Sequence, residues 1–304
     1  MQALLDAIAL ARPGQDACRI FHGRGGLYPG CEHLSLDWYA PVWVLTSFVP
    51  LNDADLQAVQ TALSRRPEPL HWVYQCRQSG EARTETRLMA GAVPEAHEVT
   101  EQGARYRVHV LRGQNHGLFL DMACGRQWLR QQARDQRVLN LFAYTCAFSV
   151  AALHGGAREV VNLDMAAGAL AIGQHNHQLN GLSGARFLAH DLFSTWGKLK
   201  RLGPFDTVVA DPPSYQKGSF VATKDYARLM RRLPDLVMPS GHVMLCLNAP
   251  ELGVEFLTTQ MAELVPSLRF VERVANPSVY ADISEDRSLK VLIYQALDHQ
   301  AGAN

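Results

Sequence analysis

The sequence predicts an α/β protein whose larger part is an open, mainly parallel β-sheet with helices on both faces. From Val138 onward, short apolar runs alternate with helix-like segments, as βαβ units do. Acidic residues and an Asp-Pro-Pro turn follow several of these runs, where parallel strands end. The first hundred residues lack this alternation. We therefore expect a small N-terminal α+β domain over residues 1–102 and the sheet domain over residues 103–304.

Composition argues against several classes of protein. The 304 residues are 47% hydrophobic and 19% charged, which suffices for a full core. Lys and Arg total 29, as do Asp and Glu, so a nucleic acid could bind only to local basic patches. No apolar run reaches the roughly 18 residues of a membrane helix, and the scattered cysteines include no CxxC pair. We expect a cytoplasmic protein without a membrane partner or a metal.

In the N-terminal domain, β-branched and aromatic runs predict strands, and a polar residue before an apolar-periodic segment predicts a helix. Asn52 or Asp53 is suited to cap a helix over residues 54–65. The expected strands cover residues 41–49, 70–75 and, just after the domain boundary, 106–111.

The sheet domain is expected to be Rossmann-like, with seven strands joined mainly by right-handed crossovers. The expected strands are 138–142, 159–163, 185–189, 205–210, 241–247, 268–275 and 289–296. The expected helices are 146–154, 166–179, 192–201, 222–236 and 251–264.

A loop between the first strand and its helix is the first candidate ligand contact. Asn140-Leu-Phe-Ala-Tyr-Thr145 offers backbone N–H groups and a helix N-terminus to an anionic ligand. It lacks the G-x-G-x-x-G pattern of dinucleotide folds, and no glycine follows until Gly155, so a pyrophosphate cannot approach this backbone closely. The loop favours a smaller cofactor. The candidate contacts are Asn140, Phe142, Ala143, Tyr144 and Thr145.

Two acidic residues follow the next two strands. Asp164 comes 24 residues after Asn140, where a carboxylate can accept hydrogen bonds from both hydroxyls of a ribose. Asp191 is placed to accept a hydrogen bond from an adenine amino group. Each also precedes a helix and could serve only as its N-cap. Their occurrence at consecutive strand ends favours cofactor binding, with Met165 and Leu192 as neighbouring contacts.

The turn Asp211-Pro-Pro-Ser-Tyr215 follows the fourth strand. Pro212 and Pro213 donate no N–H and hold the chain extended and rigid. This rigidity would fix the Asp211 carbonyl and the Tyr215 ring beside the cofactor. An ordinary rigid loop is the alternative.

Together these segments resemble the class I S-adenosylmethionine-dependent methyltransferases, and among them the bacterial 23S rRNA methyltransferases, including their cytosine-5 branch. Two further stretches support the resemblance: Arg19-Ile-Phe-His-Gly-Arg-Gly-Gly-Leu-Tyr-Pro-Gly30 and Gly113-Gln-Asn-His-Gly-Leu-Phe-Leu-Asp121. It implies S-adenosylmethionine as methyl donor, S-adenosylhomocysteine as product, and His116, Phe119 and Asp121 as residues over the cofactor; a connecting strand is the alternative. The cytosine-5 branch usually begins with a PUA domain, which we do not expect at this short N-terminus, and we therefore leave open whether the substrate is the same.

Two mechanisms are open for the acceptor atom. Carbon 5 of cytosine is not nucleophilic, so its methylation needs a thiolate that first adds at carbon 6. The resemblance places that thiolate at Cys246, but Leu245 and Leu247 stand where the family has Thr and Ser, and a buried structural cysteine is the alternative. Otherwise a base nitrogen attacks the methyl group directly, with Tyr215 stacking on the base and Asn248 holding it.

A row of basic residues adjoins the Asp-Pro-Pro turn. If residues 222–236 are helical, Lys224, Arg228, Arg231 and Arg232 share one face, with Lys217 just upstream. Such rows suit phosphate contacts, but many are only solvated helix faces. The sequence therefore predicts methyl transfer to a nucleic-acid base, with ribosomal RNA as the expected substrate. The alternatives are methylation of a small molecule or a protein, and a non-catalytic protein that binds cofactor or RNA.

Overall fold

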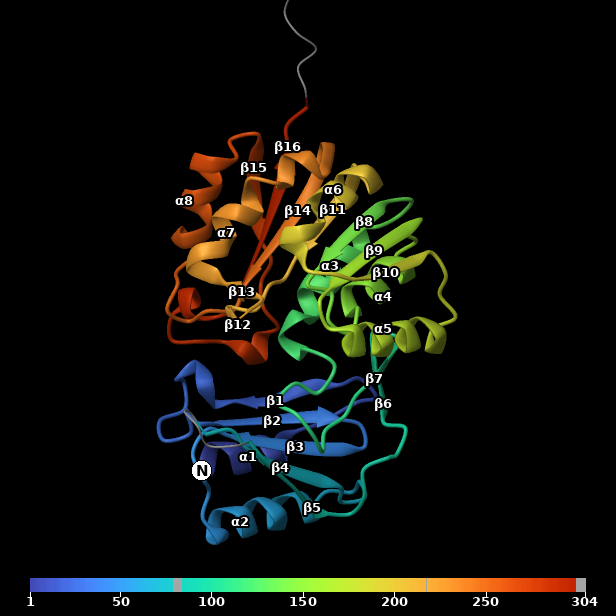
Figure 1. Cartoon of the computed structure of the whole chain (residues 1–304). Coiled ribbons are helices and arrows are strands. Elements are labelled where there is room, and N and C mark those ends of the chain that lie inside the picture. Colours follow the sequence, from blue (N-terminus) through green and yellow to red (C-terminus); the bar gives the residue numbers. More distant parts are fainter. Residues whose placement is uncertain (79–83, 217, 299–304) are drawn as a thin grey trace, which may run out of the picture. The chain divides into compact units, whose positions relative to one another are not determined.

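The computed structural model divides into two compact units (Figure 1). It describes residues 1–78, 84–216 and 218–298. Unit 1 comprises Met1–Ala123 and Pro277–Glu285, and unit 2 comprises Cys124–Asn276 and the residues from Asp286 on. None of the helices in the described ranges is long and apolar enough to cross a membrane.

Unit 1 is built on a five-stranded sheet with the strand order β1-β2-β3-β4-β5. Its elements are α1 (Gln2–Leu10), β1 (Cys18–His22), η1 (Gly23–Gly25), β2 (Leu34–Tyr39), β3 (Val42–Ser47), α2 (Asp53–Ser64), β4 (Trp72–Cys76), β5 (Glu85–Ala90), β6 (Glu98–Glu101), β7 (Ala104–Arg107), η2 (Leu120–Met122) and η4 (Ser278–Tyr280). Asn52 caps α2, since its side chain accepts a hydrogen bond from the Asp55 N–H at 2.8 Å. Apolar side chains of α1 and α2 form one core with those of the sheet.

The contact boundary at Ala123 lies beyond residue 102, where the sequence pattern changes, because the intervening segment bonds to unit 1. The Val108 N–H donates to the His97 carbonyl at 2.9 Å, and the Tyr39 hydroxyl donates to the Leu118 carbonyl at 3.2 Å. The expected strand over 106–111 is only partly present, since β7 ends at Arg107.

The distant segment Pro277–Glu285 packs against a buried ion pair of unit 1. The Arg19 guanidinium pairs with the Asp37 carboxylate, and its central carbon lies 4.8 Å from the centroid of the Tyr280 ring. Burial alone would lower the pKa of Arg19, but the neighbouring Asp37 raises it. The Ile283 N–H also donates to the Gly25 carbonyl at 2.8 Å. Tyr280, which is 261 positions away in the sequence, thus completes the surroundings of Arg19.

Unit 2 contains a seven-stranded sheet with the order β10-β9-β8-β11-β14-β16-β15, which confirms the predicted Rossmann-like arrangement. Its elements are α3 (Ala123–Gln132), β8 (Arg137–Leu141), α4 (Ala147–His154), β9 (Glu159–Asp164), α5 (Ala167–Leu179), β10 (Ala185–Ala189), α6 (Leu192–Leu202), β11 (Phe205–Ala210), β12 (Tyr215–Gln216), β13 (Phe220–Val221), α7 (Ala222–Met230), η3 (Leu233–Asp235), β14 (Val237–Leu247), α8 (Glu255–Leu264), β15 (Leu268–Arg273), η5 (Glu285–Arg287) and β16 (Lys290–Ala296). The strands from β10 to β14 run parallel, and β16 runs antiparallel to β14.

Helices cover both faces of this sheet (Figure 1). Apolar side chains of α6, α7 and α8 pack on one face, while α4 and α5 contact β8, β9 and β10 on the other. The helix expected over 222–236 ends at Met230. Its end follows from Pro234, which has no N–H to donate back to the Met230 carbonyl and stands near the start of η3.

Two glycines of unit 2 should respond oppositely to alanine. A Cβ added at Gly155 would lie 2.0 Å from the Arg130 carbonyl oxygen, whereas one at Gly168 in α5 would meet nothing within 4 Å. We expect Gly155→Ala to lower the free energy of unfolding by about 1–3 kcal/mol through overpacking. Gly168→Ala should raise it by up to about 1 kcal/mol through helix propensity. Urea denaturation measures both, and equal effects would contradict the close approach of Gly155 to the Arg130 carbonyl.

Candidate active site

The strand register brings the candidate loops to one edge of the unit 2 sheet. Leu141 at the end of β8 is paired with Ala210 of β11 and with Leu163 of β9. Asp164 of β9 is in turn paired with Ala189 of β10. The loops that follow these four strands therefore begin side by side. The strand order reverses between β8 and β11, which is where open α/β sheets bind their ligands.

The loop after β8 has an unusual backbone. Phe142, Tyr144 and Cys146 have φ angles of 58°, 47° and 61°, in the left-handed region that non-glycine residues rarely adopt. Each such residue costs about 1–3 kcal/mol unless its surroundings fix it. Here the Ala143 N–H donates to the Leu163 carbonyl at 3.0 Å, and the Cys146 N–H donates to the Ala143 carbonyl at 2.7 Å. The loop is strained and held in place.

Asp164 is the side chain that fixes this loop. Its Oδ2 accepts a hydrogen bond from the Tyr144 N–H at 2.8 Å, and its Oδ1 accepts one from the Ala166 N–H at 2.8 Å. The same carboxylate therefore joins the loop after β8 to the start of α5. Each carboxylate oxygen can accept a further hydrogen bond, so the clamp leaves room for a ligand hydroxyl.

Asp191 caps α6, as its Oδ2 accepts from the Ser194 N–H at 2.9 Å. Asp191 is therefore the N-cap of α6, and its other carboxylate oxygen can still accept a hydrogen bond from a ligand. Met165 is 48% exposed beside Asp164. In contrast, Leu192 belongs to the hydrophobic core, so only its backbone could contact a cofactor. The side chains of Ala143 and Thr145 are buried as well.

A chain of hydrogen bonds between buried polar side chains stabilises the half of the sheet that carries the candidate cofactor contacts. Asn140 donates to Asn162 at 2.9 Å, Asn162 donates to Ser149 at 3.0 Å, and Ser149 Oγ lies 2.8 Å from His177 Nε2. His177 Nδ1 lies 2.7 Å from the Gly173 carbonyl, which can only accept, so Nδ1 carries the proton. Burial lowers the pKa of His177 and favours the neutral ring, in which Nε2 accepts from Ser149. The direction of every hydrogen bond in the chain is fixed, with His177 neutral.

Sequence patterns did not identify Asn162, Ser149 or His177 as part of this chain. Asn162 interrupts an otherwise apolar strand, and that interruption is the one available signal. Asn176, which donates to the Thr145 carbonyl at 3.0 Å, is a further member of the same region that was missed.

The Asp-Pro-Pro turn begins beside the cofactor loop, and the Asp211 N–H lies 3.5 Å from the Leu141 carbonyl. Pro212 is buried and Pro213 half-buried. The Ser214 hydroxyl donates to the carbonyl of Asn248, which is the first residue after β14. The Tyr215 side chain is 73% exposed. The turn is thus tied to the end of β14 and presents an aromatic ring.

The cysteines near this edge are buried. Cys246 is fully buried on β14, and its own carbonyl accepts a hydrogen bond from the Tyr226 hydroxyl. Cys146 is buried as well; desolvation, with a smaller effect of Asp164, raises the pKa of its thiol well above the ordinary value. Neither thiol is presented at the surface of unit 2.

The remaining predicted residues lie elsewhere in the chain. His116 and Phe119 belong to unit 1. His116 is buried against the edge of the Tyr39 ring, and desolvation lowers its pKa to about 3. Phe119 is 40% exposed. Lys217 lies outside the described residues.

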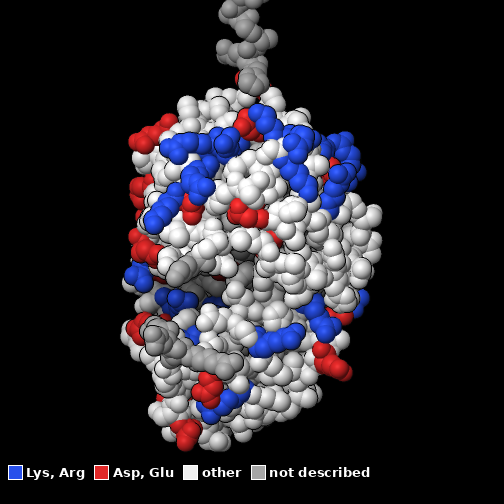
Figure 2. Space-filling model, in the orientation of Figure 1, with Lys and Arg blue, Asp and Glu red and all other residues white. Residues whose placement is uncertain are grey.

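The basic row is exposed on α7 and just after it. Lys224, Arg228, Arg231 and Arg232 are all exposed. Arg228 pairs with Asp225 at 2.8 Å, and its guanidinium carbon lies 3.9 Å from the centroid of the Phe193 ring in α6. Figure 2 shows Lys and Arg side chains gathered over the part of unit 2 where Figure 1 draws α6 and α7. The patch thus extends over two helices.

The polar groups at the edge match a nucleoside cofactor with a short anionic tail. Two carboxylates stand at neighbouring strand ends, where hydroxyl and amino groups are the natural donors. The loop after β8 leads into the N-terminus of α4, which favours a carboxylate. No glycine in this loop opens the close approach that a pyrophosphate requires.

Comparison with known proteins agrees with this chemistry. Residues 18–295 match the model of the family described as S-adenosylmethionine-dependent methyltransferase. The chain belongs to this family, and S-adenosylmethionine is the cofactor that the family's name gives.

Individual relatives refine the comparison. Ribosomal RNA large subunit methyltransferase I of Aeromonas hydrophila is 32% identical over 225 residues, which are 71% of this chain and 53% of that protein. The protein of the same name from Erwinia tasmaniensis is 28% identical over 298 residues, 93% of this chain and 74% of that one. The chain thus spans about half the length of the Aeromonas relative. A Streptococcus mutans structure assigned to the S-adenosylmethionine-dependent methyltransferases shares the fold, with a TM-score of 0.84 and 23% identity over 97% of this chain and 81% of that one.

The neutral state of His177 predicts a pH dependence of stability. Burial lowers the pKa of His177, so the folded protein favours the uncharged ring. The network's contribution is therefore complete above the unfolded-state pKa of about 6.5 and is lost as the pH falls toward the folded-state pKa. His177→Leu should cost about 1–3 kcal/mol at neutral pH. Urea denaturation from about pH 8 to about pH 5 should show this difference shrinking, and a constant difference would contradict the assignment.

Proposed function

We propose that this protein transfers a methyl group from S-adenosylmethionine to a base of large-subunit ribosomal RNA, directly to a base nitrogen. Membership of the methyltransferase family supports the cofactor, and the names of the Aeromonas and Erwinia relatives support the substrate. The hydrogen bond from Ser214 to the Asn248 carbonyl carries the proposal most directly. It joins the Asp-Pro-Pro turn to the residue after β14. The two loops thus form one surface for the base that accepts the methyl group, called here the acceptor edge.

The cofactor half of the edge binds and orients. S-adenosylmethionine supplies a methyl group activated on a sulfonium. Asp164 accepts hydrogen bonds from the ribose hydroxyls while it keeps the Tyr144 and Ala166 N–H groups bound. Asp191 accepts from the adenine amino group with the oxygen that does not cap α6. Because both carboxylates are fixed by backbone groups beforehand, little reorganisation accompanies binding.

The acceptor half positions the base. The exposed Tyr215 ring stacks on the base, as aromatic side chains do on unpaired RNA bases. The carbonyl groups of the rigid turn accept the hydrogen of the attacking nitrogen, and Asn248, exposed at the end of β14, holds the edge of the base. Positioning of this kind supplies most of the rate enhancement when no covalent intermediate forms.

The burial of Cys246 favours direct transfer over the covalent cytosine mechanism. A thiolate that adds to carbon 6 must reach the base, whereas the Cys246 side chain is wholly buried between strand neighbours. Its Leu245 and Leu247 neighbours are buried too, and they point into the core formed with α7 and α8. The RNA backbone would lie along α7, where Lys224, Arg228, Arg231 and Arg232 contact phosphates.

Methyl transfer to RNA from cells that lack this protein tests the proposal. We expect the purified protein to label large-subunit RNA from those cells and not RNA from the parent strain, in which the nucleotide is already methylated. Asp164→Ala should abolish cofactor binding in calorimetry and labelling alike. Arg231→Gln with Arg232→Gln should raise the KM for RNA and leave cofactor affinity unchanged, since phosphate contacts act on RNA alone. Labelling of a small metabolite or a protein instead would refute the proposal that ribosomal RNA is the substrate.

Substitution of Cys246 separates the two mechanisms. We expect Cys246→Ala to keep turnover within about threefold of the native value, because a buried thiol takes no part in direct transfer. Asn248→Ala should lower turnover by about tenfold or more, since it loosens the base. Both variants should bind S-adenosylmethionine normally. Loss of transfer in Cys246→Ala with cofactor affinity intact would instead identify Cys246 as a nucleophile.

A further inference from the structure

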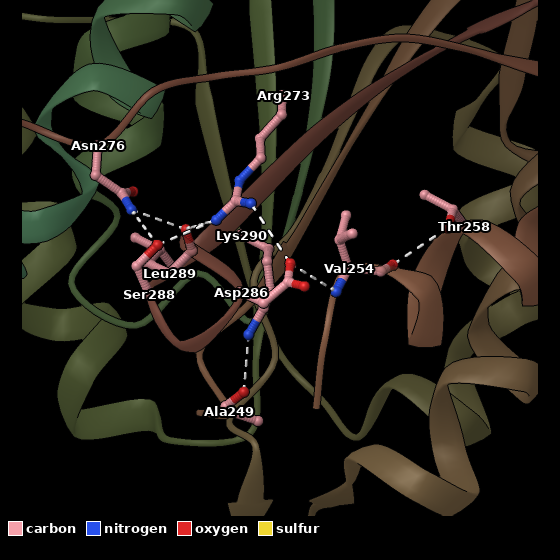
Figure 3. A network of polar contacts seen from close by, with 9 residues as sticks. All are labelled: Ala249, Val254, Thr258, Arg273, Asn276, Asp286, Ser288, Leu289 and Lys290. Carbon is pink, nitrogen blue, oxygen red and sulfur yellow. Dashed lines mark hydrogen bonds and ion pairs between the residues drawn. The ribbon is translucent and has the colours of Figure 1, made fainter. Parts of the chain in front are cut away.

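The loop Asn248–Val254, which follows β14, is held at both ends by one short segment of chain. Asp286 and Lys290 delimit that segment, which leads into β16. The loop has no helix or strand of its own, so its shape depends on side chains that bind its backbone. Figure 3 shows these contacts.

Lys290 fixes the beginning of the loop. It is fully buried, and its Nζ donates to the Ala249 carbonyl at 2.9 Å. In the sheet it is paired with Leu247, the last residue of β14, and its side chain reaches two residues further along the chain. Lysine is rarely buried completely, because removing its ammonium group from water is costly. An apolar residue at this strand position would avoid the free-energy cost of desolvating a charge, so stability alone does not explain a lysine here.

Asp286 fixes the other end of the loop. Its Oδ1 accepts a hydrogen bond from the Val254 N–H at 3.4 Å and lies 3.8 Å from Arg273 Nη1. Arg273 also donates to Ser288 Oγ at 3.0 Å. Asn276 donates to the same oxygen at 3.1 Å and to the Leu289 carbonyl at 2.9 Å. The segment that holds the loop is thereby fastened to the end of β15.

The start of the loop is also the acceptor edge. The Asn248 carbonyl accepts from Ser214 of the Asp-Pro-Pro turn, and the next carbonyl, that of Ala249, accepts from Lys290. Two adjacent peptide groups are therefore fixed from opposite sides, one by the turn and one by β16. Asn248 is exposed between these two attachments.

We propose that Lys290 and Asp286 are positioning residues, which hold the loop Asn248–Val254 so that Asn248 meets the acceptor base. This assignment rests on the proposed function, because it concerns the geometry of the same edge. Lys290 acts through the Ala249 carbonyl and Asp286 through the Val254 N–H, and neither touches the reacting atoms. An error of about 1 Å in such a position can cost about 100-fold in rate.

The test combines kinetics with hydrogen exchange. Lys290→Met, which keeps the length of the side chain and removes its donor, should lower kcat about 10- to 100-fold. The dissociation constant for S-adenosylmethionine should stay unchanged, since Asp164 is the last residue of β9 and Asp191 is the N-cap of α6, away from this loop. The amides of residues 248, 249 and 251–254 should exchange faster, while those of β9 and α5 should not. Lys290→Gln retains an N–H donor and should recover part of kcat, which a loss of packing alone would not allow.

Asp286 provides a second variant if Lys290→Met does not fold. Asp286→Ala removes the acceptor of the Val254 N–H, whereas Asp286→Asn keeps an acceptor oxygen, so only the first should raise exchange near Val254 and lower kcat. Glu263→Ala on the exposed face of α8 is the matched control. Native exchange in the loop, or an unchanged kcat in an active protein, overturns the assignment. If the native protein methylates no RNA, the proposed function fails separately, and exchange in residues 248–254 still decides whether these side chains hold the loop.

Discussion

The carboxylate of Asp164 is the contact on which the cofactor half of the sheet depends. It binds the Tyr144 and Ala166 N–H groups at 2.8 Å each and so joins the loop after β8 to the start of α5. That loop contains three non-glycine residues in the left-handed region, a conformation that persists only where the surroundings enforce it. The group proposed to bind the ribose is therefore also the group that fixes the loop after β8. Under the proposed function, folding and ligand binding would use the same two oxygens.

The two halves of the edge are fixed by different means. On the cofactor side, the buried chain from Asn140 to His177 satisfies polar groups beneath the loop, and satisfied networks of this kind rigidify a core. On the acceptor side, side-chain donors bind three carbonyls at and just after the end of β14. Tyr226 donates to that of Cys246, Ser214 to that of Asn248 and Lys290 to that of Ala249. The backbone is thus held in place where β14 continues into the loop.

The sequence allowed the sheet of unit 2 to be predicted nearly strand by strand, because buried parallel strands are continuous apolar runs separated by helices of regular period. Unit 1 was harder. Its strand β5 (Glu85–Ala90) carries mixed side chains and owes its structure to pairing with β4, which no local pattern reveals. At the site, the sequence placed Asp164 and Asp191 after strands; Asp164 is the last residue of β9 and Asp191 is the N-cap of α6.

The burial of individual residues could not be predicted from the sequence in the same way. Lys290 and Cys246 are both fully buried, which is rare for lysine and common for cysteine. Their partners come from β14, β16 and α7, which are separated in the sequence. Only the fold brings them together.

The discontinuity of unit 1 bears on how such a chain can be rearranged in evolution. Pro277–Glu285 is encoded between two strands of the other unit, yet its Tyr280 ring covers the Arg19 guanidinium. A recombination event that exchanged residues 1–123 as one cassette would separate these partners. A transplanted first unit would carry a buried arginine without its aromatic cover, so inheritance of the two units as a single gene is the arrangement that keeps both intact.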